Sequence, residues 1–293
     1  MTIKEALKKP YYVIKHNHAL WFNIFNRTGR RLFLRHPLEL SAVEKRIVSD
    51  LDSRGIAFTS LDELTPGENL LEKLDAYMAT LDASADFGHK KSFLKPLWDP
   101  RAILDFDNPF FRFALSEKAL AIASSYLRMW PRFKYQTLNI TLPVSKGNKA
   151  EFSQRWHRDP EELKQLKVFI YLSDVTPDRG PFIYVAGSNH GTNAYSTLFP
   201  QQPPAGVYPP DGAVEKAVNA KDMIVATGKP GTVIFCDTSG LHKGGYATGG
   251  DRVMYTTLFT APSYAEKPWY RRGNAWKSRI ASLTPIQRFA LHD

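Results

Sequence analysis

The second half of the chain contains five short segments with the residue pattern of β-strands. Apolar residues alternate with polar ones over residues 134–144, and β-branched and aromatic residues dominate residues 167–172, 181–185, 231–236 and 252–260. Gly, Pro, Asp and Asn separate these segments, as is typical of turns. Because the strands follow a helical front half, the pattern predicts an α+β chain whose second half is a small β-barrel or sandwich.

The front half shows three helical patterns. A capping-box pattern at residues 41–44 predicts a helix that ends at Gly55 and is followed by an edge strand. A second helix is predicted to start at residues 65–66, with a hydroxyl cap and a proline in its first turn. A third is predicted from Ser116 to about Trp130, since a proline follows.

We interpret the whole chain as one domain with three parts. Residues 1–131 are the mainly helical front half, residues 132–260 the barrel core, and residues 261–293 a helical tail. Residues 191–228 interrupt the strands with a proline-rich stretch, and an insertion of this length predicts a lid over a substrate. Residues 86–109, rich in Asp, Lys, Pro and Phe, are predicted as loop.

Composition excludes several classes of partner. The net charge is +10, but the basic residues are scattered and no nucleic-acid-binding motif accompanies them, so we expect a solvated basic surface and no nucleic acid. No run of about 18 apolar residues exists, which predicts no membrane span. The start lacks the pattern of a secretory signal, so we expect a cytoplasmic protein. The single Cys236 excludes an internal disulfide and a thiolate zinc cluster. The oligomeric state stays open.

The stretch R-W-H-R-D-P at residues 155–160 carries the strongest chemical signal. His157 and Asp159 are separated by one residue, so both side chains can leave a strand end on the same side. An imidazole and a carboxylate together make two thirds of the 2-His-1-carboxylate triad that holds non-haem Fe(II). His242 offers the second imidazole, and Arg252 follows it at the start of a strand. The set, with each member beside a strand-like segment, predicts a metal site.

These residues lie in blocks that resemble the phytanoyl-CoA dioxygenase family of Fe(II)- and 2-oxoglutarate-dependent oxygenases. The blocks follow the family's order over roughly residues 135–260 and read W-H-R-D-P, L-S-D-V-T-P-D-R-G-P-F-I-Y-V-A-G-S-N-H, G-T-V-I-F-C-D-T-S-G-L-H-K-G-G and R-V-M-Y-T-T-L-F. The helical front half is similar to the family in general character only. The resemblance implies a double-stranded β-helix, that is, a jelly-roll, cupin-like barrel flanked by N-terminal and C-terminal helices.

The resemblance also implies the chemistry. His157, Asp159 and His242 would hold Fe(II), 2-oxoglutarate would chelate the iron, and O2 would react there with release of succinate and CO2. Arg252 would bind the distal carboxylate of 2-oxoglutarate through two charge-assisted hydrogen bonds. Halogenases of this superfamily usually have a small residue in place of the carboxylate. The intact Asp159 therefore favours hydroxylation over chlorination.

Five further residues are weaker candidates. Asn139 and Lys167 are predicted to contact 2-oxoglutarate, Asn139 because some relatives have an Asn at a similar place and Lys167 if its strand face points inward. Arg158 is a candidate for binding an anionic substrate, and Trp156 and Tyr135 are candidates for lining its pocket. The competing interpretation is solvation for the polar side chains and core packing for the aromatic ones.

The functional hypothesis is a dioxygenase that hydroxylates a small-molecule metabolite, with anionic compounds and natural-product intermediates as the candidate classes. Two alternatives stay open: a jelly-roll protein that binds metal and ligand without turnover, and a cupin-type metalloenzyme that does not use 2-oxoglutarate. Arg252 argues against both, because neither needs a cosubstrate anchor. The sequence leaves open the substrate, the regiochemistry, and whether the outcome is hydroxylation, desaturation, cyclisation or epimerisation.

Overall fold

Two antiparallel sheets dominate the computed structural model, which describes residues 14, 16–82, 84–88, 91–145, 147–191, 194–201 and 208–292. Within this part of the chain, the larger sheet has the strand order β1-β7-β4-β9-β3-β2 and the smaller one the order β6-β5-β8. The strands are β1 (Ile56–Ser60), β2 (Leu94–Pro96), β3 (Arg132–Thr141), β4 (Leu166–Tyr171), β5 (Phe182–Val185), β6 (Met223–Ala226), β7 (Thr232–Cys236), β8 (His242–Lys243) and β9 (Arg252–Thr260).

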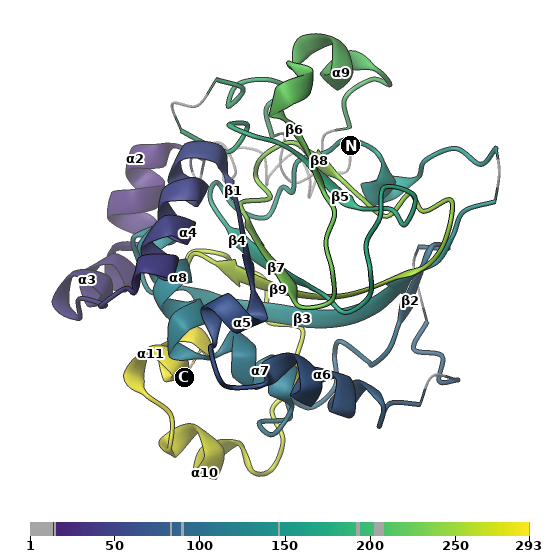
Figure 1. Ribbon diagram of the computed structural model, residues 1–293. Coiled ribbons are helices and arrows are strands. Elements are labelled where there is room, and N and C mark those ends of the chain that lie inside the picture. Colours follow the sequence, from purple (N-terminus) through teal and green to yellow (C-terminus); the bar gives the residue numbers. More distant parts are fainter. Residues whose placement is uncertain are drawn as a thin grey trace, which may run out of the picture.

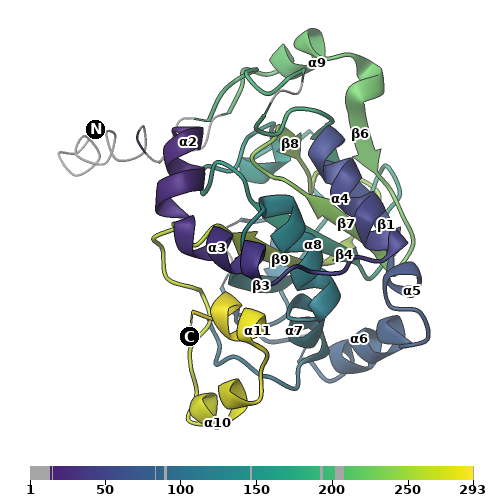
Figure 2. The same cartoon turned by 90° about the vertical axis from the view of Figure 1, so that its left-hand side faces the viewer.

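The sheets form the expected jelly roll, with the small sheet above the large one and the barrel not fully closed (Figure 1). Most helices lie outside the large sheet, on the side away from the small sheet (Figures 1 and 2). The helices are α2 (His18–Leu20), a π-helical turn (Trp21–Phe25), α3 (Arg27–Arg35), α4 (Ala42–Arg54), α5 (Leu61–Leu64), α6 (Leu70–Met78), α7 (Pro109–Ala114), α8 (Glu117–Leu127), α9 (Ala213–Ala217), α10 (Trp276–Ala281) and α11 (Pro285–Ala290). None of these described helices is both long and apolar enough to cross a bilayer.

The two faces of the large sheet bury different residues. On β4, Leu166, Val168 and Ile170 join the large hydrophobic cluster that the helices cover. The alternate residues Phe169 and Tyr171 join a second cluster, which lies between the two sheets. The large cluster takes residues from the front helices, the barrel strands and the tail, which supports our proposal that the chain is one domain.

The first helix–strand unit matches its sequence signals. The Ser41 and Glu44 side chains form the reciprocal capping box at the start of α4. Gly55 ends the helix in the left-handed conformation, with φ of 76°, and its amide bonds the Leu51 carbonyl at 2.9 Å. β1 follows at the edge of the large sheet, as predicted.

The predicted helix start at residues 65–66 is wrong. The Thr65 hydroxyl donates to the Leu61 carbonyl at 2.8 Å, so it closes the short helix α5 instead of opening the next one. α6 begins only at Leu70, after Asn69 in a left-handed conformation. The third helix, α8, has the predicted Ser116 cap but ends at Leu127, before the expected residue 130.

Two connecting regions contain more structure than the sequence patterns indicated. Residues 86–109, predicted as loop, include β2, which pairs with β3 and extends the large sheet. The insertion 191–228 contains β6, which pairs with β5 and forms an edge of the small sheet. The remaining part of the predicted lid includes residues 192–193 and 202–207, which lie outside the described residues.

Candidate metal and cosubstrate site

The backbone brings the two histidines together. The His157 amide donates to the His242 carbonyl at 2.9 Å, and the His242 amide donates back to the His157 carbonyl at 2.9 Å. Residues in such an antiparallel pair project their side chains to the same side of the sheet. The ring centroids are accordingly 4.1 Å apart. β8, which begins at His242, also pairs with β5 and so fixes the site to the small sheet.

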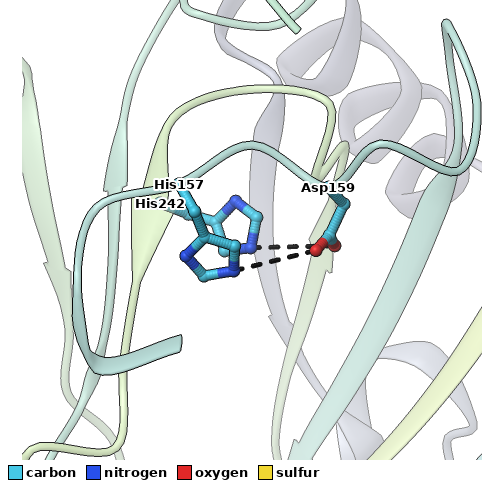
Figure 3. Close-up of side chains that lie close together, drawn as sticks. All are labelled: His157, Asp159 and His242. Atoms are coloured by element: carbon cyan, nitrogen blue, oxygen red, sulfur yellow. Dashed lines mark ion pairs between the residues drawn. The ribbon is translucent and has the colours of Figure 1, made fainter. Parts of the chain in front are cut away.

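Asp159 completes the group (Figure 3). Its amide donates to the Thr238 carbonyl at 3.0 Å, which ties it to the same loop that leads into His242. One ligand atom from each of His157, Asp159 and His242 lies within 4.8 Å of the others, and all three residues are buried. Two imidazoles and one carboxylate in this arrangement fit a non-haem iron.

Backbone carbonyls determine which ring nitrogens face the centre of the group. Nδ1 of His157 lies 2.9 Å from the Arg155 carbonyl, and Nδ1 of His242 lies 2.9 Å from the Gly240 carbonyl. A carbonyl can only accept, so each Nδ1 carries the proton and each Nε2 keeps a free lone pair. Both Nε2 atoms lie 3.7 Å from the Asp159 carboxylate oxygens. The ligand set is therefore oriented by the protein itself.

Electrostatics favours the protonation states that metal binding requires. Burial is the largest single influence on Asp159 and opposes its ionisation, but the Lys167 ammonium, 2.5 Å from Oδ2, and the two histidines together outweigh burial and hold the carboxyl pKa well below its usual range. Burial, with His157 nearby, lowers the pKa of His242 to about 3. Near neutral pH the group therefore offers an ionised carboxylate and neutral imidazoles.

These residues line a cavity of about 350 Å³ between the sheets, and Arg252 lies in its wall. The Arg252 Nη1 donates to the Gly180 carbonyl at 2.5 Å and Nη2 to the Thr141 hydroxyl at 3.1 Å. The Nε group of Arg252 is buried and has no hydrogen-bond partner among the described residues. A buried, partly unsatisfied guanidinium fits a carboxylate ligand, because an unpaired buried donor is costly.

The weaker sequence candidates divide into two groups. Asn139, Lys167 and Tyr135 line the cavity, although Lys167 contacts the ligand Asp159 in this structure. Arg158 and Trp156 are not among the cavity-lining residues.

Arg158 and Trp156 have structural partners instead. The Arg158 guanidinium donates to backbone carbonyls of six different described residues, namely Ser188, Tyr195, Ser196, Leu198, Phe199 and Ser239. The Trp156 indole donates to Glu215 at 2.6 Å. Side-chain alternation could not reveal this, because the partners come from distant loops.

Sequence reasoning missed two residues of the cavity. Lys91, from the stretch predicted as loop, lines the wall and donates to the Ser153 hydroxyl at 2.9 Å. Trp269, from the tail, stacks on Tyr135 with ring centroids 4.3 Å apart. Neither residue belongs to a periodic pattern or motif, so no local signal marked them.

The fold and the site together define a jelly-roll protein with a 2-His-1-carboxylate centre and a buried arginine in the same cavity. The family model described as phytanoyl-CoA dioxygenase (PhyH) matches residues 57–254, more than half of the chain. The chain therefore belongs to the phytanoyl-CoA dioxygenase family. No curated protein sequence matches it.

Solved structures share the fold. The epimerase SnoN, in a complex described as containing Fe3+, alpha ketoglutarate and nogalamycin RO, superimposes with a TM-score of 0.55 at 15% identity, covering 78% of this chain and 87% of that one. The apo form of EctD from S. alaskensis superimposes with a TM-score of 0.50 at 19% identity, covering 82% of this chain and 84% of that one. At these identities the likeness shows the fold alone.

Proposed function

We propose that this protein is an Fe(II)- and 2-oxoglutarate-dependent dioxygenase that hydroxylates a small molecule. The observation that carries the proposal is the convergence of His157, Asp159 and His242 on one point of a cavity that also contains Arg252. Membership of the phytanoyl-CoA dioxygenase family supports it. Relatives in fold with iron or 2-oxoglutarate in their descriptions agree with this choice of cofactors.

Each side chain has a distinct role in this proposal. His157, Asp159 and His242 would hold iron, which when bound supplies the coupling of 2-oxoglutarate decarboxylation to C–H oxidation by O2. Arg252 would anchor the distal carboxylate of 2-oxoglutarate and so orient the molecule toward the iron. Asn139, on the same wall, would offer its amide to the cosubstrate.

The apolar wall has a role of its own. Phe169, Phe182 and Met254 line the cavity beside the polar residues. They limit the access of water, and this strengthens the charge-assisted bonds made by Arg252. The intact Asp159 supports hydroxylation in preference to halogenation, because it completes a 2-His-1-carboxylate set.

The test is an anaerobic titration of the metal-free protein with Fe(II) and then 2-oxoglutarate, followed by visible absorption. The proposal expects a charge-transfer band that needs both additions. The band should be absent in His157→Ala, and in Arg252→Ala it should require at least about tenfold more 2-oxoglutarate, since a charge-assisted pair is lost. Arg179→Ala is the matched control, because Arg179 lies outside the cavity and is paired with Asp251 at 4.0 Å.

Turnover separates an enzyme from a protein that only binds. With Fe(II), 2-oxoglutarate and O2, a substrate should increase succinate release, and the organic product should gain one oxygen atom. If the protein binds iron and 2-oxoglutarate but no tested compound stimulates succinate release, the result would favour a protein that binds ligands without turnover. A folded, metal-loaded protein that shows no band would refute the dioxygenase proposal.

A further inference from the structure

The cavity has two ends with different chemistry. Arg252 marks one end, at the start of β9. Lys167 and Tyr135 both pair with Leu258 of β9, six residues further along. At about 3.4 Å per residue this places their backbones roughly 20 Å from that of Arg252 along the strand. The cosubstrate arginine and the end that contains Lys167 and Tyr135 are therefore well separated.

A second lysine reaches the cavity from the segment before β2, whose Leu94 pairs with Thr141, the β3 residue opposite Arg252. Lys91 lines the same cavity, and after burial the Lys167 ammonium is the strongest influence that lowers the Lys91 pKa. Asp159 and Glu161 act on Lys91 in the opposite direction, so the group faces charges of both signs. Lys91 and Lys167 together make the cavity wall cationic.

The charge of the cavity is not balanced by the proposed cofactors. Three lining cations, Lys91, Lys167 and Arg252, face one lining carboxylate, Asp159. The charges of a divalent iron and a dianionic 2-oxoglutarate cancel each other, so the lining side chains leave a net formal charge of about +2. Glu161 lies near but does not line the cavity, and burial raises its pKa to about 7. Even when Glu161 is ionised, the excess stays positive.

Lys91 is the cation that is free to meet a ligand. Lys167 already contacts Asp159, and Arg252 lies at the cosubstrate end. Lys91 donates to the Ser153 hydroxyl, and no described carboxylate lies within 4.0 Å of its ammonium. A largely buried ammonium without an acidic partner gains most from an anionic ligand, since the charge is otherwise poorly compensated.

Aromatic surface lines the same cavity. Trp269 is 37% exposed and stacks on Tyr135, with an angle of 18° between the ring planes. Both rings line the cavity. Its volume of about 350 Å³ is near the lower end of the usual range for ligand pockets, roughly 300–1,000 Å³, and 2-oxoglutarate must share it. The substrate portion that enters must therefore be small.

We propose that this cavity binds a small substrate through a carboxylate or phosphate group that Lys91 recognises. Lys91 binds the anionic oxygens, and the apolar part of the substrate packs on the Trp269–Tyr135 pair. This inference rests on the proposed dioxygenase function, because it assigns Arg252 to the cosubstrate. Lys91 then determines which class of substrate is accepted.

The test compares three probes of similar shape, phenylacetate, phenylacetamide and phenyl phosphate. Each is titrated calorimetrically into protein that contains Zn(II) and saturating 2-oxoglutarate. The wild type should bind at least one of the two anions about tenfold or more tightly than the amide. The stronger of the two anions identifies the preferred group. Equal binding of the anions and the amide overturns the proposal, and this comparison needs no variant.

Variants then assign the preference to a residue. Lys91→Met should remove the preference for the anion, whereas Lys91→Arg, which keeps the charge, should retain it. Lys95→Met is the matched control: it removes the same charge from the same segment, but Leu94 and Pro96 line the cavity and Lys95 does not. A preference that survives in Lys91→Met or disappears in Lys95→Met contradicts the assignment.

The charge-transfer titration distinguishes this inference from the proposed function. In Lys91→Met the band should form at the wild-type concentration of 2-oxoglutarate. If that concentration rises instead, or if 2-oxoglutarate displaces the anionic probe, Lys91 belongs to the cosubstrate and the inference is overturned. If the wild type shows no band but keeps a Lys91-dependent preference for the anion, the dioxygenase proposal fails while the anion site stands.

Discussion

The ammonium of Lys167 lies 2.5 Å from Oδ2 of Asp159, the carboxylate of the candidate metal site. Both side chains are largely buried, and Asp159 helps to raise the pKa of the Lys167 ammonium well above its usual value although burial opposes this. A partner of this kind orients a metal-binding carboxylate and keeps it ionised. We therefore propose that Lys167 supports Asp159, while the contact with 2-oxoglutarate expected from the sequence stays a prediction.

The contact predicts how Lys167 variants behave. Lys167→Met should weaken metal binding about tenfold, because the carboxylate loses the group that orients it. Lys167→Arg should retain most of the affinity. At saturating metal the concentration of 2-oxoglutarate needed for half-maximal band intensity should change little in Lys167→Met, but strongly in Arg252→Ala. Calorimetry with Mn(II) measures the metal affinity, and the charge-transfer titration measures the 2-oxoglutarate requirement. Unchanged metal affinity with a raised 2-oxoglutarate requirement in Lys167→Met would show that Lys167 contacts the cosubstrate.

Gly55 is predicted to be intolerant of any side chain. Its φ is +76°, and an added Cβ would lie 2.3 Å from the Tyr184 hydroxyl and 2.8 Å from Asn189. Gly55→Ala should therefore lower the free energy of unfolding by more than about 2 kcal/mol, through backbone strain and the clash together. Gly67→Ala is the control, since Gly67 has φ of +78° with nothing within 4 Å. Urea unfolding of Gly67→Ala should show a loss of only about 1 kcal/mol of unfolding free energy. Equal losses in the two variants would show that the clash at Gly55 does not contribute.

Arg158 is predicted to stabilise the segment at residues 194–201. Its buried guanidinium bonds carbonyls of Tyr195, Leu198 and Phe199, and an ammonium cannot replace this fork. Arg158→Lys should cost about 2–4 kcal/mol of unfolding free energy and speed proteolytic cleavage within the segment. The neighbour Arg155, whose side chain is 39% exposed, is the control. Arg155→Lys should change stability by less than about 0.5 kcal/mol, and unchanged cleavage in Arg158→Lys would contradict the prediction.

The buried carboxyl group of Asp237 is predicted to make the stability of the fold depend on pH. Its carboxylate accepts from the Tyr126 hydroxyl at 2.5 Å and from the Ser239 amide at 3.0 Å, and burial raises its pKa above the usual value. The folded protein therefore binds the proton more tightly than the unfolded chain does. The contribution of Asp237 to stability is full below about pH 3.8 and falls as pH rises from there through the raised pKa.

Asp237→Asn removes this titration and keeps the shape. The stability of the variant relative to the wild type should consequently improve as pH rises from 4 toward 7. Urea unfolding of both proteins at three pH values in this range measures the difference. A difference that is constant, or that moves in the opposite direction, would show that Asp237 is not held in the protonated form by the fold.

Local sequence patterns predicted much of the architecture. The cap at Ser41, the glycine at 55 and the alternation in β3 and β9 each depend on residues close together in the chain, and the structure contains them as expected. β6 was missed because its short apolar run lies within a proline-rich insertion. The helix start at Thr65 was wrong because a hydroxyl followed by proline can equally end the preceding turn.

The sequence by itself determined the main barrel strands, the α+β class and the set His157, Asp159, His242 and Arg252, because alternation and short motifs are properties of neighbouring residues. Only the tertiary structure decided that Lys167 contacts Asp159, that Arg158 is bonded to distant carbonyls, and that Lys91 and Trp269 share one cavity. Those relationships join residues far apart in the chain. They arise from the packing of two sheets and their loops, which no local pattern encodes.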